Sequence, residues 1–261
     1  AMRGGGLVAW DGSQVSITNT IISNNRSGST GGGIYCQINV SIIVEDCIIS
    51  NNTASAIFGT HDGGGVGVYD NCQAIFKRVQ ITNNSAQGQG GGIYSSEYSD
   101  IQLINTTISG NTLLNYTHPH AGGGGLQVGP HTSATIVNSI IYGNSAPRGS
   151  QIQYWVNTST NQTIDFSDIE GGENGIYVNN GTSQSTSLAV FNNGTGNIDQ
   201  SPLFVDTANQ DYHLQASSPC IDAGDPNANY NDPDGTRNDI GAYFTYQEFG
   251  CTDASACNYD S

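Results

Sequence analysis

The 261-residue chain carries 6 Lys and Arg residues against 22 Asp and Glu residues, which gives a formal net charge of −16. This acidity argues against nucleic acids and anionic membranes as partners, because phosphates are bound through Lys and Arg side chains. No apolar run approaches the roughly 18 residues that a membrane-spanning helix needs. The Ile, Val and Leu residues occur in short runs, which indicates many short strands rather than amphipathic helices.

Glycine-led segments recur through the first half of the chain. The first apolar residue after each glycine run lies 27, 32, 27 and 33 residues after the previous one. These residues are Leu7, Ile34, Val66, Ile93 and Leu126. A repeat of this length is typical of solenoids, in which each repeat contacts only its neighbours.

Each glycine-led strand is followed by a second apolar strand and then by a stretch of the Ile-Ile type that ends in Asn. Two columns of apolar residues should therefore stack inward from coil to coil: Ile17, Val44, Phe76, Leu103 and Ile136, and Ile22, Ile49, Ile81, Ile108 and Ile141. Asn and Gly at the corners supply the left-handed backbone of sharp turns, and Asn side chains at one corner should form a hydrogen-bonded ladder. The sequence predicts an all-β parallel β-helix with three short strands per coil, since the frames of leucine-rich repeats and propellers are absent.

Two regions resemble known proteins. The Gly-Gly-Gly-Ile-Tyr run and its Ile-Ile-x-x-Asn stretch resemble the right-handed parallel β-helix repeats of secreted bacterial proteins in the pectate-lyase-like superfamily. Residues 201–226 and 232–243 are similar to the closing segment of such proteins, and residues 250–259 look like a cysteine-containing repeat of secreted or cell-surface proteins. The resemblance implies a secreted or surface location, with coils over 1–200, a closing segment over 201–249, a truncated tail repeat over 250–261, and neighbouring domains in a longer native chain.

The six cysteines lack the CxxC pairs of zinc sites, which predicts structural or buried thiols. Cys251 and Cys257 lie in the short polar tail, which favours an oxidising compartment. A disulfide between these two is one open pairing.

Aromatic side chains are expected on the outer face of the glycine-led strands, as a platform for sugar rings. They are Trp10, Tyr35, Tyr69 and Tyr94. Two insertions before this strand carry His61, His118 and His120, and loops that interrupt a regular scaffold often carry function. We therefore expect a glycan-binding groove here, although aromatic residues are also common on sheet faces and loop histidines are usually only solvated. With Asp62 the histidines also have the ligand types of zinc, at a spacing that is not a recognised frame.

An acidic block near the C-terminus is a candidate calcium site. It comprises Asp222, Asp225, Asp232, Asp234 and Asp239. Calcium takes six to eight oxygen ligands, often from loops of this composition. Alternatively, these carboxylates stabilise turns by accepting hydrogen bonds from local backbone, with Asp239 pairing to Arg237.

Lys77 and Arg78 are adjacent basic residues with the chemistry of a lyase that cleaves uronic-acid polymers. Such an enzyme needs a base for the proton next to the carboxylate and cations for the resulting anion, and His61 is a third candidate. Alternatively, Lys77 and Arg78 align with Glu45 and Asp46 of the previous coil, so cross-coil ion pairs explain them.

Two functions remain open from the sequence. The first is an extracellular module of a larger protein that binds glycans or mediates adhesion. The second is a polysaccharide lyase or related glycan-cleaving enzyme, which rests on analogy of fold alone. Paired catalytic carboxylates are not evident, because Asp62, Asp70 and Asp100 do not fall in one column.

Overall fold

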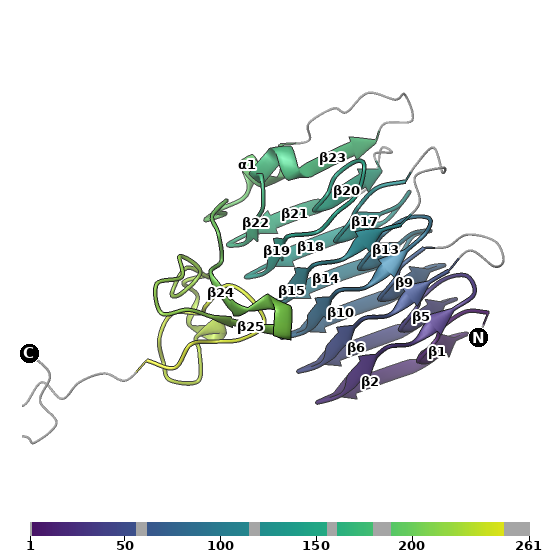
Figure 1. The fold of residues 1–261 in the computed structure, drawn as a ribbon, viewed down its shortest axis with the longest axis horizontal. Helices are drawn as coiled ribbons and strands as arrows, with labels where there is room; N and C mark the ends of the chain where they lie inside the picture. Colours follow the sequence, from purple (N-terminus) through teal and green to yellow (C-terminus); the bar gives the residue numbers. More distant parts are fainter. Residues whose placement is uncertain (1, 56–61, 115–120, 156–160, 180–188, 248–261) are drawn as a thin grey trace, which may run out of the picture.

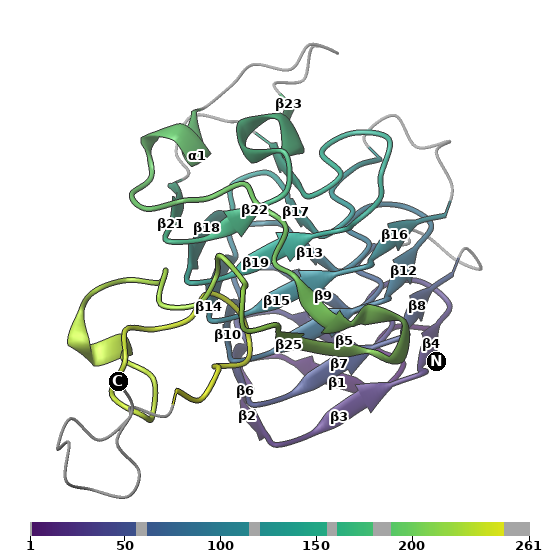
Figure 2. The ribbon, with the colours of Figure 1, turned by 60° about the vertical axis from the view of Figure 1, so that its left-hand side comes forward.

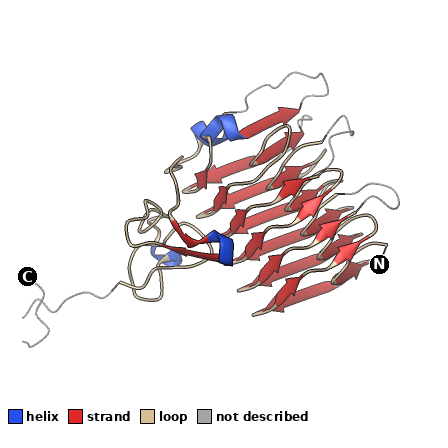
Figure 3. Cartoon of the chain, viewed as in Figure 1, coloured by secondary structure: helices blue, strands red, loops and turns tan. Residues whose placement is uncertain are grey.

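The computed structural model describes residues 2–55, 62–114, 121–155, 161–179 and 189–247. These residues form a stack of coils, and each coil contributes one strand to each of several parallel sheets (Figures 1 and 3). Every strand in the stack pairs in parallel with the equivalent strand of the next coil. The predicted all-β parallel β-helix is confirmed.

Three sheets, which we name A, B and C, correspond to the three predicted strands of each coil. Sheet A comprises β1 (Leu7–Trp10), β5 (Ile34–Gln37), β9 (Val66–Tyr69), β13 (Ile93–Ser95), β17 (Leu126–Val128), β20 (Ile152–Trp155) and β23 (Ile176–Asn179). Sheet B comprises β2 (Gln14–Thr18), β6 (Ser41–Glu45), β10 (Gln73–Lys77), β14 (Asp100–Ile104), β18 (Ser133–Val137) and β21 (Gln162–Asp165). Sheet C comprises β3 (Ile21–Ser23), β7 (Ile48–Ser50), β11 (Gln80–Thr82), β15 (Thr107–Ser109), β19 (Ile140–Tyr142) and β22 (Asp168–Ile169).

A fourth sheet of two-residue strands, which the sequence did not predict, completes the first four coils. It comprises β4 (Arg26–Ser27), β8 (Thr53–Ala54), β12 (Ser85–Ala86) and β16 (Thr112–Leu113). Both predicted inward columns are confirmed, since Phe76 pairs in register with Val44 and Leu103, and Ile81 pairs with Ile49 and Ile108. Their side chains are buried in one continuous core.

The glycine runs are required by the close approach of successive coils. Gly31 has a φ of +62°, a left-handed conformation that L side chains rarely adopt. At Gly32 a Cβ atom would lie 2.1 Å from the carbonyl oxygen of Gly64 in the next coil. A side chain at either position would therefore strain the backbone or separate the coils.

The predicted asparagine ladder is present and buried. Asn25, Asn52, Asn84, Asn111 and Asn144 each donate from Nδ2 to the side-chain oxygen of the next member or, at the end, of Gln151, over 2.8–3.0 Å. From Asn52 onward the same nitrogen also donates to a backbone carbonyl of the preceding coil. The four buried amides, Asn52, Asn84, Asn111 and Asn144, are thus paired on both sides, which removes the cost of burying them.

Residues 201–247 form a segment, which we call the C-terminal arm, that folds back along the outer face of sheet C (Figure 2). The chain reaches it through the 3₁₀ turn η1 (Gly172–Gly175), strand β23 and the short helix α1 (Val190–Asn193). The arm contains the antiparallel strands β24 (Phe204–Asp206) and β25 (Asp211–Leu214) and the 3₁₀ turns η2 (Thr207–Asn209) and η3 (Ala228–Tyr230). The predicted division at residues 200 and 249 stays a prediction.

The arm is held by outward-facing residues of sheet C. The hydroxyl of Tyr243 donates to Gln80 Oε1 over 2.9 Å, and the Ala242 amide donates to Thr107 Oγ1 over 3.0 Å. Ile140, which also points outward, packs against Leu214, Cys220 and Ile240 of the arm. At Gln80, Thr107 and Ile140 the first residue of the Ile-Ile-type pair therefore faces the arm, while the second residue faces the core.

Cys36, Cys47, Cys72 and Cys220 are buried free thiols, as predicted for the part of the chain that is described. Burial raises the pKa of Cys36 to about 12, which keeps this thiol protonated and inert. Cys251 and Cys257 lie outside the described residues. Within the described residues, helices long and apolar enough to cross a membrane are absent.

Candidate functional site

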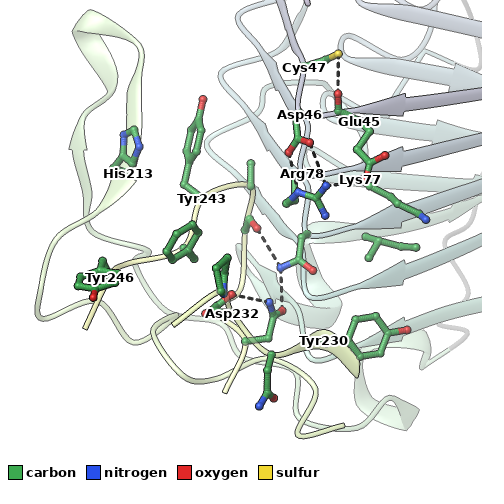
Figure 4. A pocket seen from close by; sticks show the side chains of 18 of the residues that line it. Glu45, Asp46, Cys47, Lys77, Arg78, His213, Tyr230, Asp232, Tyr243 and Tyr246 are labelled. Atoms are coloured by element: carbon green, nitrogen blue, oxygen red, sulfur yellow. Dashed lines mark hydrogen bonds and ion pairs between the residues drawn. The ribbon is translucent and has the colours of Figure 1, made fainter. Parts of the chain in front are cut away.

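A pocket of about 920 Å³ opens between the solenoid and the C-terminal arm (Figure 4). One wall is the corner between sheets B and C in the second to fourth coils, and the other wall is the arm. We call it the lateral pocket. Its lining residues include Glu45, Asp46, Lys77, Arg78, Asn105, His213, Asn229, Tyr230, Asn231, Asp232, Asn238, Tyr243, Phe244 and Tyr246.

The solenoid wall carries an ion-pair cluster that joins two coils. Arg78 donates from Nε to Asp46 Oδ1 over 2.7 Å and from Nη2 to Glu45 Oε1 over 2.6 Å. Its Nη2 also donates to Asp46 Oδ2 over 3.0 Å, so Asp46 is held in bidentate geometry. The hydrogen bonds that Arg78 donates to Asp46 and Glu45 raise the pKa of Arg78 above its ordinary value despite partial burial. The predicted cross-coil ion pairs are confirmed for Arg78, and Lys77 lies opposite Glu45 in the register.

The arm wall is rich in aromatic rings. His213 and Tyr243 stack with ring centroids 4.2 Å apart, and His213 Nδ1 lies 2.7 Å from Asp211 Oδ1. Phe244 and Tyr246 are 41% and 68% exposed. The pocket therefore offers open ring faces beside the charged corner of the solenoid (Figure 4).

Amide and carboxyl groups fix the floor of the pocket. Asn105 at the solenoid corner donates to Asn238 Oδ1 over 2.8 Å and to the Asp239 carbonyl over 3.0 Å. Asn238 in turn donates to Asp232 Oδ1 over 3.0 Å. Burial, with the nearby charge of Asp239 as the next cause, raises the pKa of Asp232 to about 6. The arm is thus anchored through a buried polar chain rather than by apolar contact alone.

Four of the five aspartates predicted to bind calcium hold the arm's turns by accepting from backbone amides, and the fifth, Asp222, accepts from Gln247 Nε2 over 2.7 Å. Asp239 accepts from the amides of Asp222 and Thr245, and Asp232 accepts from the amide of Asp239. Asp234 likewise accepts from the amides of Thr236 and Gln247, and Asp225 from that of Asn227. Within the described residues, groups of three or more His, Cys, Asp or Glu side chains suited to a metal ion are absent. Calcium binding stays a prediction.

The expected pairing of Asp239 with Arg237 is wrong. Arg237 donates instead to the backbone carbonyls of Gly224 and Ala223, over 2.6 Å and 3.2 Å. Its guanidinium also lies 6.0 Å from the ring centroid of Phe166, so it links the arm to the solenoid.

The four aromatic residues predicted to form a platform do stack along sheet A. Centroid distances are 6.2 Å from Trp10 to Tyr35, 5.6 Å from Tyr35 to Tyr69 and 5.2 Å from Tyr69 to Tyr94. The rings come from two register columns rather than one, since the ring of Tyr69 leans over Gly67, which occupies the column of Tyr35 and Tyr94. Only Trp10 is exposed, at 43%, while Tyr35 and Tyr94 are buried. Most of the ring area is therefore used in packing.

The predicted histidine site at the insertions lies outside the described residues, because it depends on His61, His118 and His120. The groove and the zinc site at these loops stay predictions, as does the catalytic role of His61. Asp62, which belongs to the same set, is buried, and its Oδ2 accepts from the Tyr69 hydroxyl over 3.4 Å.

A carboxyl pair that sequence reasoning missed joins neighbouring coils at the corner between sheets A and B. A hydrogen bond with Asp70, with burial as the next cause, raises the pKa of Glu97 to about 7. Asp70 also accepts from Gln37 Nε2. Only aspartates were considered as candidate paired carboxylates in the sequence, so Glu97 was overlooked.

Sequence reasoning also missed the arm's contribution to the lateral pocket, above all His213, Tyr230, Phe244 and Tyr246. The run Tyr243-Phe244-Thr245-Tyr246 concentrates three aromatic residues within four positions and was the available signal. Its partner wall, the corner of Lys77 and Arg78, was singled out for its chemistry but not as part of a pocket.

Comparisons with known proteins agree with this architecture. Residues 1–113 match the family described as a right handed beta helix region. The chain is 28% identical over 134 residues to the probable autotransporter YfaL of Escherichia coli (strain K12), covering 45% of this chain and 10% of that protein. No solved structure matches the chain. The match over residues 1–113 agrees with the observed fold, and the chain is a secreted or cell-surface right-handed parallel β-helix protein.

Proposed function

We propose that this chain is a module of a longer secreted or surface protein that binds glycans, in an adhesive role, through the lateral pocket. The observation that carries the proposal is the meeting of exposed aromatic rings with amide and carboxylate groups in one pocket. Sugar rings present apolar C–H faces that stack on aromatic rings, and hydroxyl groups that both donate and accept hydrogen bonds.

The size and position of the pocket support this proposal. A volume of about 920 Å³ lies at the upper end of the range for ligand pockets, which suits an oligosaccharide better than a single sugar ring. The pocket lies on the side of the solenoid, so a glycan chain can enter and leave without passing either end. The length of YfaL, of which the match covers 10%, supports a role as one part of a larger protein.

Alanine at Tyr246 or at Phe244 is expected to weaken glycan binding by about tenfold, or about 1.4 kcal/mol. Each change removes an exposed ring from the arm wall of the pocket. The ligand would be identified on a glycan array, and its affinity measured by isothermal titration calorimetry. Tyr98→Ala is the matched control, because Tyr98 is 66% exposed, stacks on His131 and lies outside the pocket. An array without binding, or equal losses in all three variants, contradicts the proposal.

A second candidate function is uronate lyase activity, because Lys77 and Arg78 both line the lateral pocket. Lys77 would take the proton next to the uronate carboxylate, and Arg78 would stabilise the anion. The two carboxylates already bound to Arg78 argue against this second role.

Lyase activity predicts a rise in ultraviolet absorbance from the unsaturated product when the protein is incubated with alginate, pectate and other uronates. Lys77→Ala and Arg78→Ala should each abolish this rise. A flat absorbance trace for the unmodified protein across the panel, together with binding on the glycan array, excludes lyase activity.

A further inference from the structure

Arg78 is the feature of the lateral pocket that bears on which class of glycan it takes. Two of its nitrogens, Nε and Nη2, are bonded to the carboxylates of Asp46 and Glu45. A free guanidinium binds a carboxylate through two parallel N–H donors. In this pocket Asp46 and Glu45 already occupy Nε and both donors of Nη2, so a ligand carboxylate could bind Arg78 through two parallel donors of different nitrogens only by displacing Asp46 or Glu45.

The net charge of the pocket lining also disfavours an anionic ligand. Lys77 adds one positive charge opposite Glu45, and Asp232 adds one negative charge on the arm. Three acidic and two basic lining side chains (Glu45, Asp46 and Asp232 against Lys77 and Arg78) give a formal sum of −1. The whole chain has a formal net charge of −16, so the long-range field also repels polyanions.

The same groups are well suited to uncharged hydroxyls. Glu45 and Asp46 are 33% and 40% exposed, so their outer lone pairs are open to donors from a sugar. The amides of Asn229 and Asn231 line the arm side, where they can donate and accept. Phe244 and Tyr246 supply the stacking faces.

We infer that the lateral pocket takes neutral glycans and discriminates against uronic-acid polymers. This inference rests on the proposed glycan binding and names its substrate class. A neutral sugar hydroxyl meets acceptors and ring faces, whereas a uronate carboxylate meets an occupied guanidinium, one ammonium group and three like charges.

The first experiment compares binding of the same polysaccharide with and without its carboxylate charges. The probes are polygalacturonate and its fully methyl-esterified form, beside neutral cello-, xylo- and manno-oligosaccharides and acidic alginate and hyaluronate. Affinities are measured by calorimetry at about 50 mM and about 300 mM NaCl, since salt screens interactions between exposed charges. The tightest neutral probe should bind at least about tenfold more tightly than any uronate, which is about 1.4 kcal/mol. Its affinity should change less than about twofold with salt.

The second experiment removes the carboxylates that bind the Arg78 guanidinium and tests whether uronates then bind more tightly. The double variant Glu45→Gln with Asp46→Asn removes both charges that hold Arg78 and should raise uronate affinity at least about tenfold. The matched control is Asp11→Asn with Asp100→Asn, which removes two acidic charges outside the pocket and should leave uronate affinity unchanged. A gain in the control as large as in the pocket variant would assign the effect to net charge and overturn the inference.

The outcomes separate the two proposals. Preferential, salt-sensitive binding of uronates by the unmodified protein overturns the neutral-glycan inference and leaves glycan binding standing. Failure to bind any probe or array glycan overturns both. If circular dichroism shows that the double variant does not fold, the esterified and unesterified polymers decide the question with the unmodified protein.

Discussion

Leucine in place of Asn84 is expected to lower the free energy of unfolding by roughly 3–5 kcal/mol. The Asn84 amide is buried at the centre of the ladder, where Nδ2 donates to Asn111 and to the Ile49 carbonyl. Its oxygen accepts from both the backbone amide and the side-chain amide of Asn52. Leucine has a similar volume but leaves these partners buried without hydrogen bonds, at about 1–3 kcal/mol for each group that cannot reach water.

Chemical denaturation monitored by circular dichroism would measure this loss. Gln73→Leu is the matched control, because it removes an amide from an exposed position of the same coil. The control should change stability by less than about 0.5 kcal/mol. A loss below about 1 kcal/mol for Asn84→Leu would mean that the ladder is replaced by other contacts and does not hold the coils together.

Asparagine in place of Asp168 is expected to stabilise the protein by roughly 2–4 kcal/mol at pH 8 and to have little effect at pH 4. Asp168 is fully buried between sheet C and the arm, where it accepts from the Gln200 amide and the Cys220 thiol. Burial raises its pKa to about 7. Because this value exceeds the unfolded value of about 3.9, the folded protein holds the proton more tightly.

The pH dependence of stability follows from that difference. Each pH unit between about 4 and 7 should cost about 1.4 kcal/mol through Asp168, so stability is highest below this window and is lost as the pH rises through 7. The pKa values of Glu97, Asp232 and Asp239 are also raised, so ionisation of these groups likewise lowers the free energy of unfolding as the pH rises. Thermal unfolding at pH 4 and pH 8 measures the effect, with Asp100→Asn as an exposed control. Equal slopes in Asp168→Asn and the unmodified protein would contradict it.

The solenoid was predictable because each coil repeats the same local pattern of apolar, glycine and asparagine residues. Each inward position, such as Phe76 or Ile81, needs only an apolar residue one coil above and below, and the spacing of the glycine runs supplies the register. The asparagine ladder follows from the same spacing. Gly32 shows the physical reason for the regularity, since the carbonyl of the next coil occupies the place of a side chain.

The arm and its pocket were not predictable by the same route. Gln80, Thr107 and Asp168 are polar residues at outward positions, which suggests a solvated sheet face, yet all three are buried beneath the arm. The pocket depends on contacts between residues 45–105 and residues 213–246, and no repeat relates the two segments. The sequence predicted that Trp10 and Tyr35 would belong to an open platform for sugar rings, but not that the rings would pack on one another and leave only Trp10 exposed.

The C-terminal arm changes how the solenoid should respond to force. Successive coils contact only their neighbours, so a simple solenoid can peel open one coil at a time. Here the arm is fastened to the second, third, fourth, fifth and sixth coils, through Asn51, Asn83, Asn105, Asn138 and Asp168. Because the arm contacts all five of these coils, tension applied to one coil is transmitted to coils more than a hundred residues away in the sequence. A protein that holds a glycan at the cell surface would thereby resist shear as a single mechanical unit.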